Sequence, residues 1–81
     1  MPPRLPQASG RDVIRLLERL GYEFVRQRGS HIRVRKVTPA GTHNITVPVH
    51  RTIAQGTLNS ILSDVSVWNG IPKDELIEQL R

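Results

Sequence analysis

Residues 27–35 have the sequence Gln27-Arg28-Gly29-Ser30-His31-Ile32-Arg33-Val34-Arg35. We predict a turn centred on Gly29 and, directly after it, a strand that begins at His31. Successive side chains of a strand point to opposite faces, so Ile32 and Val34 lie on one face. The other face then carries an imidazole and two guanidinium groups, those of His31, Arg33 and Arg35. This face is positively charged and includes a group that titrates near neutral pH, so we interpret it as a phosphate-facing site, with chemistry on RNA as the leading hypothesis.

Two further strands are predicted on either side of this one. Residues 22–27 are rich in aromatic and β-branched side chains, and we expect both Tyr22 and Phe24 in the core. Residues 37–43 form the predicted hairpin loop, and residues 44–50 alternate again. Within this last segment a proline, Pro48, cannot donate to a sheet ladder, which makes the strand an edge strand or leaves that position facing solvent.

Two amphipathic helices are predicted, one before and one after the strands. The first has Ser9 as its N-cap, with Asp12 in the capping-box position, and it ends at Gly21. Its apolar residues follow the i, i+3, i+4, i+7 pattern: Val13, Leu16, Leu17 and Leu20. The second begins near Gly56 or Thr57 and repeats that pattern with Leu58, Ile61, Leu62 and Val65. A short last helix is expected after Pro72.

The order of helix, three strands, helix and short helix predicts an α+β fold with two layers. This αβββα order is that of the double-stranded-RNA-binding domain, here with a short C-terminal helix added. The sheet face that carries His31 stays uncovered. Residues 1–8 contain three prolines and little to bury, so we expect a loose tail, followed by a single domain over residues 9–81.

Composition narrows the class of protein. The chain has 81 residues and no cysteine, which excludes disulfides and thiolate zinc sites. No apolar run approaches the roughly 20 residues of a membrane span, and no signal-peptide core follows Met1. We therefore expect a soluble, cytoplasmic protein that does not contact a membrane.

Positive charge is concentrated in the middle of the chain, whose net charge is +5. No acidic residue occurs between Phe24 and Ser63. The basic residues of that segment, together with the glycine and serine of the turn, are the predicted RNA-binding residues: Arg26, Arg28, Gly29, Ser30, Arg33, Arg35, Lys36 and Arg51. Charge clustering by itself is equally consistent with a solvated strand face.

Several short motifs resemble one known family. They are Leu20-Gly21-Tyr22, Arg26-Gln27-Arg28-Gly29-Ser30-His31, Val47-Pro48-Val49-His50, Gly56-Thr57-Leu58 with Ile61-Leu62, and the closing segment Gly70-Ile71-Pro72-Lys73-Asp74-Glu75-Leu76. The succession of G-S-H, P-x-H and G-T-L-x-x-I-L resembles the HicA toxins of bacterial toxin–antitoxin modules over roughly residues 9–81. The resemblance implies a ribosome-independent endoribonuclease, an mRNA interferase. It also implies inhibition by a HicB-type antitoxin and a functional histidine at the position of His31.

RNA supplies its own nucleophile, the 2′-hydroxyl group, so cleavage needs mainly proton transfer and charge stabilisation. His31 is the predicted catalytic residue, and His50 is a possible second catalytic residue if a meander brings the two together. A histidine in a P-x-H motif can equally be structural. We expect no cofactor and no metal, because three histidines without nearby carboxylates make a poor site for either magnesium or zinc.

Two alternatives to the enzyme remain open. The same basic face would serve a non-catalytic RNA-binding module, or a module that recognises an acidic protein and never touches RNA. If the chain is a toxin, the antitoxin is expected to cover the His31 face, because an acidic partner is steered to a positive surface.

Overall fold

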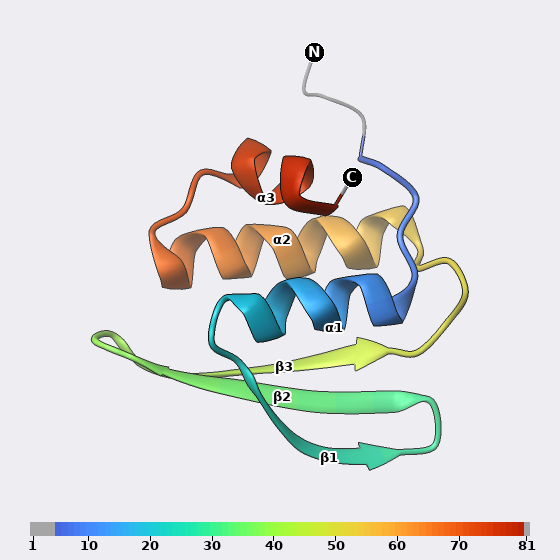
Figure 1. The fold of residues 1–81 in the computed structure, drawn as a ribbon, viewed down its shortest axis with the longest axis horizontal. Coiled ribbons are helices and arrows are strands. Elements are labelled where there is room, and N and C mark those ends of the chain that lie inside the picture. Colours follow the sequence, from blue (N-terminus) through green and yellow to red (C-terminus); the bar gives the residue numbers. More distant parts are fainter. Residues whose placement is uncertain (1–4, 81) are drawn as a thin grey trace.

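The computed structural model describes residues 5–80, which form one antiparallel sheet and three helices on one side of it (Figure 1). The elements are α1 (Gly10–Arg19), β1 (Glu23–Arg28), β2 (His31–Thr38), β3 (Gly41–Pro48), α2 (Gln55–Asn69) and α3 (Lys73–Leu80). The strand order is β1-β2-β3. The predicted α+β, αβββα arrangement of the double-stranded-RNA-binding fold is confirmed, with α3 packed against α1 and α2. None of the helices within residues 5–80 is long and apolar enough to cross a membrane.

The first helix begins and ends where the sequence predicts. The backbone N–H of Asp12 donates to the Ser9 hydroxyl at 3.1 Å, and the Ser9 N–H donates to the Asp12 carboxylate at 3.0 Å. This reciprocal capping box satisfies donors that a helix N-terminus otherwise leaves unpaired. After the last turn, Gly21 has a φ of +101°, a conformation that L side chains rarely adopt, so the chain turns towards β1 there.

The hairpin between β2 and β3 is tighter than predicted. Both strands run further towards the hairpin than expected, and only Pro39 and Ala40 separate them. At its other end β3 stops at Pro48 and does not reach the predicted His50. The Thr38 hydroxyl accepts from the Ala40 N–H at 3.1 Å and donates to the Gly41 carbonyl at 2.9 Å. This side chain supplies local hydrogen bonds to the turn, which explains why the predicted loop over residues 37–43 is mostly strand.

The core lies between the sheet and the helices. It contains the apolar stripes predicted for α1 and α2, with Val34, Ile45 and Val47 from the sheet. Tyr22 is buried, as predicted, but the prediction for Phe24 is wrong, since its side chain is 64% exposed. Phe24 is exposed because it lies on the edge strand that the helices do not cover. Helix α1 packs against β3, whereas β1 contacts chiefly β2.

Residues 5–8, expected in a loose tail, are packed against the domain. Ala8 is buried, and Leu5 packs against the core. The Ile53 N–H donates to the Ala8 carbonyl at 2.8 Å, which ties this segment to the connection between β3 and α2. The remainder of the predicted tail, residues 1–4, lies outside the described residues.

A partly buried chain of polar contacts lies on the helix side of the sheet. Lys36 Nζ donates to Asn69 Oδ1 at 2.6 Å, and Asn69 Nδ2 donates to the Tyr22 hydroxyl at 3.0 Å. The Tyr22 hydroxyl lies 2.6 Å from His43 Nδ1. The Tyr22 oxygen accepts from Asn69, and the tautomer of His43 sets which of the two rings donates in the second contact. The Trp68 ring stacks on His43 at a centroid distance of 4.7 Å.

Burial lowers the pKa of His43, because desolvation disfavours the charged imidazolium, and the carboxylate of Asp64 opposes this to a smaller extent. The folded protein thus binds a proton at His43 less readily than the unfolded chain does. The stabilisation is complete above the pKa of an unfolded histidine, about 6.5, and it is lost as the pH falls below that value.

We therefore expect the urea midpoint of unfolding to decrease between pH 7.5 and pH 5. In His43→Gln this decrease should be absent, whereas His31→Ala, which changes an exposed histidine, should retain it. Asp12 does not interfere, because its carboxyl pKa is also lowered and its contribution disappears only below about 3.8. An equal decrease in His43→Gln would contradict the assignment.

Candidate functional site

Strand register brings the basic residues of β1 and β2 onto one face of the sheet. His31 is paired with Arg28 on β1 and with Pro48 on β3, and Arg33 is paired with Arg26 and Thr46. Residues opposite each other on neighbouring strands have their side chains on the same face. This face points away from the helices, because Val34, which follows Arg33 on β2, is buried in the core on the helix side.

The side chains of this cluster surround a shallow depression of about 100 Å³. It is lined by Arg26, Arg28, His31, Arg33 and Thr46, and these five residues are called the His31 depression below. Four of the five are predicted site residues that the structure brings together. Thr46 is the addition: its outward orientation follows from the alternation of its strand, but only the register places it opposite Arg33.

A β-bulge on β1 determines which side chains reach the depression. The register shifts by one residue between Phe24 and Arg26. Without this shift, continuous alternation from Phe24 would turn Arg26 and Arg28 towards the helix side. With the extra residue, Val25, both arginines turn to the same face as His31.

The turn after β1 holds Arg28 and His31 next to each other. Gly29 has a φ of +54°, and a Cβ built on it would meet no atom within 4 Å, so the glycine serves backbone conformation and not packing. The Gln27 side-chain amide donates to the Gly29 carbonyl at 3.0 Å. The Val49 N–H donates to the Ser30 carbonyl at 2.6 Å, so the chain leaving β3 braces the turn.

The end of β3 is also held by close packing against the start of α1. The Gly10 N–H donates to the His50 carbonyl at 2.9 Å. A Cβ at Gly10 would lie 2.2 Å from the Pro48 carbonyl oxygen, so only glycine allows α1 to approach β3 this closely. The His50 side chain is exposed in the connection after β3 and does not line the His31 depression. The structure therefore does not bring the two histidines into one cavity.

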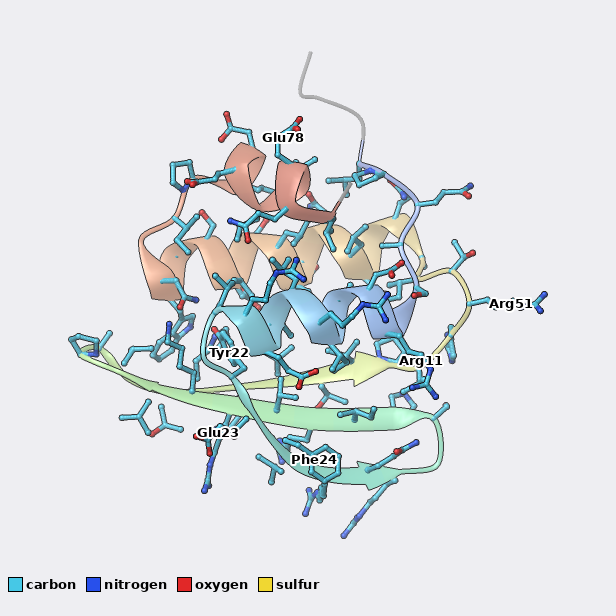
Figure 2. All side chains as sticks on the ribbon, in the orientation of Figure 1. Arg11, Tyr22, Glu23, Phe24, Arg51 and Glu78 are labelled. Carbon is cyan, nitrogen blue, oxygen red and sulfur yellow. The ribbon has the colours of Figure 1, made fainter. Side chains whose placement is uncertain are left out.

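Three other predicted RNA-binding residues lie apart from the depression. Arg35 is on the same face but further along β2, where it is paired with Glu23 and Asn44. Arg51 extends from the connection between β3 and α2 (Figure 2). Lys36 shares the helix side of β2 with Val34, and its ammonium group donates to Asn69.

The arginines of the depression have no carboxylate partner within residues 5–80, where Arg15 and Asp12 form the only salt bridge. Arg33 is half-buried, and its Nε has no hydrogen-bond acceptor in the same part of the chain. An unpaired buried donor costs roughly 1–3 kcal/mol. The depression is therefore a cationic surface without internal neutralisation, suited to a polyanion or an acidic protein.

The model of the family described as "HicA toxin of bacterial toxin-antitoxin" matches residues 10–67. Neither the search of curated proteins nor the search of solved structures gave a significant match. The matched segment runs from the first residue of α1 into the last turns of α2, and it contains the whole sheet and the His31 depression. Because the family model covers more than half of the 81 residues, this chain belongs to the HicA toxin family.

Proposed function

We propose that this toxin is a ribosome-independent endoribonuclease that cleaves mRNA at the His31 depression, in the cytoplasm and under the control of a HicB-type antitoxin. The observation that carries the proposal is the position of His31. Its exposed imidazole stands at the start of β2 among three arginines that have no carboxylate partner within residues 5–80. A proton-transfer group surrounded by cations is the minimum that RNA cleavage by the 2′-hydroxyl requires.

His31 would act on a proton of the reaction, either by removing it from the attacking 2′-hydroxyl or by delivering it to the 5′-oxygen that leaves. Both steps are general acid–base catalysis, in which histidine is the side chain most often used. The complementary proton step is left to water, since His50 does not line the depression.

The arginines would hold the scissile phosphate and offset the charge that develops on it. Guanidinium groups bind phosphate oxygens in a bidentate fashion, and Arg26, Arg28 and Arg33 line one small depression. The exposed Gly29-Ser30 turn adds backbone N–H groups at the rim, and Arg35 extends the positive face along the strand. The proposed mechanism uses no metal ion. The residues that line the depression include no carboxylate, and carboxylates are the ligands that a magnesium ion would need.

An antitoxin that lies over this face would inhibit without distorting the toxin. The depression is open and shallow, so a protein surface placed on it excludes an RNA strand sterically. The positive charge of the face favours an acidic contact surface on the antitoxin and accelerates association.

The first prediction concerns His31→Ala. Loss of general acid–base catalysis should lower the rate of mRNA cleavage by about two to four orders of magnitude. Because His31 is exposed and makes no side-chain hydrogen bond within residues 5–80, the melting temperature should remain near that of the wild type. Cleavage of a defined mRNA by purified protein is the measurement, and Thr42→Ala, an exposed position of β3 outside the depression, is the control.

The same assay separates the enzyme from a non-catalytic RNA-binding module. If wild-type protein binds the mRNA and yields no fragments, the binding module is the correct function. If His31→Ala cleaves at a rate close to that of the wild type, His31 is not the catalytic residue.

A second prediction concerns the salt dependence of RNA binding. Each phosphate neutralised on a single strand contributes about 0.7 to the slope of log affinity against log salt concentration. We expect Arg26→Ala and Arg28→Ala each to reduce the slope by about that amount. Arg11→Ala removes the same charge from α1 and should leave the slope unchanged. A flat titration for the wild type would show that phosphate contacts do not supply the affinity.

A third prediction concerns masking by the antitoxin. Hydrogen exchange of residues 26–36 should become slower when the antitoxin is bound, because the Gly29-Ser30 turn and the strands beside it are then covered. Charge reversal at Arg33 or Arg35 should weaken both inhibition and RNA binding. Slower exchange confined to the helices would mean that inhibition does not work by covering the His31 face.

A further inference from the structure

The two edges of the sheet differ in how they are protected against another strand. β1 carries Glu23, Arg26 and Arg28 and is interrupted by a bulge, and both features discourage strand addition. β3 is the opposite edge and runs for eight residues without a lysine, arginine, aspartate or glutamate. Its only obstacle is Pro48, at its last position. An unprotected edge of this length is a template for backbone pairing.

A groove of about 310 Å³ lies along this β3 edge, with α2 as its other wall. It is lined by His43, Asn44, Ile45 and Thr46 of β3 and by Thr57, Ser60, Ile61 and Asp64 of α2. Side chains alternate between the two faces of a strand, so a groove lined by consecutive residues follows the strand edge. The helical residues recur at i, i+3, i+4 and i+7 and form one face of α2.

We propose that this β3–α2 groove binds an extended segment of the antitoxin, which adds to the sheet as a fourth strand beside β3. A groove between an edge strand and a helix is suited to this mode of recognition, in which backbone hydrogen bonds supply affinity and the helix wall supplies side-chain selectivity. The inference rests on the antitoxin partner of the proposed function and does not depend on RNA cleavage.

Charge identifies the occupant as a different protein and not a second copy of this chain. Asp64 lies in the groove and has no salt-bridge partner within residues 5–80. β3 contains no lysine or arginine, so a second β3 strand in the groove would offer Asp64 no cation. Two copies with a net charge of +5 each also repel one another. The antitoxin segment therefore carries a lysine or arginine opposite Asp64.

The groove is continuous with the candidate active site. Thr46 lines both the groove and the His31 depression. An antitoxin strand anchored beside β3 thus places the rest of its domain next to the depression. Strand addition would fix the orientation of the antitoxin, and its acidic surface would then lie over His31.

The test compares two variants of α2 with the same charge change. Ser60→Arg fills the groove, whereas Val67→Arg adds an arginine to an exposed position of α2 outside it. We expect Ser60→Arg to weaken binding of the purified antitoxin about tenfold or more in calorimetry. Residues at the centre of an interface carry most of the binding energy, and the arginine would occupy that centre. Val67→Arg should bind like the wild type. Both variants should cleave mRNA at the wild-type rate, so loss of binding is distinguished from failure of the proposed enzyme.

Asp64→Asn supplies a second variant if Ser60→Arg does not fold, and it should weaken binding by a smaller factor. Hydrogen exchange of β3 amides should become slower when the antitoxin binds, while that of residues 23–25 of β1, which lie outside the His31 depression, should not. Wild-type affinity in a folded Ser60→Arg variant, or protection of residues 23–25 of β1 in place of β3, would overturn the proposal. Dimerisation of the toxin alone that Ser60→Arg abolishes would assign the groove to a second copy.

Discussion

The candidate site depends on one irregularity in the pairing of β1 with β2. Alternation ties every side chain of a strand to the orientation of its neighbours, so a regular β1 that pairs Phe24 with Val34 would direct Arg26 and Arg28 towards the helices. Val25 breaks this constraint as a bulged residue. The same strand therefore presents an apolar side chain on one face and, two residues later, a guanidinium group on the other. Register, and not charge alone, assembles the His31 depression.

The two faces of the sheet have separate tasks. The helix side carries the core and the chain of polar contacts from Lys36 to His43, and every one of those polar groups has a partner. The outer side carries side chains that have few partners within the chain. Residues that stabilise the fold are therefore distinct from residues that meet a ligand. Such a division lets the outer face keep uncompensated charge at little cost to the core.

The sequence allows the capping box of α1, both apolar stripes and the outward orientation of His31 and Arg33 to be predicted, because each is set by local periodicity. The position of Arg26 and Arg28 depends on a bulge that leaves no local pattern. Lys36 is predicted to bind RNA from its charge alone. The alternation of β2 places its side chain on the helix side, where it donates to Asn69. Phe24 is exposed because the helices do not extend over β1, and no property of Phe24 itself indicates that.

The bonds that close the domain join the start of the chain to its middle, since residues 8 and 10 are held by residues 53 and 50. Translation adds roughly 5–20 residues per second from the N-terminus, so α1 has no anchor on the sheet until β3 and the connection after it have been made. His31 is synthesised well before that point, but the depression around it also needs Thr46 from β3. The proposed catalytic surface and the strand edge proposed to bind the antitoxin are thus completed by the same late segment. In a newly made chain, the His31 depression and the open edge of β3 therefore form in the same folding step.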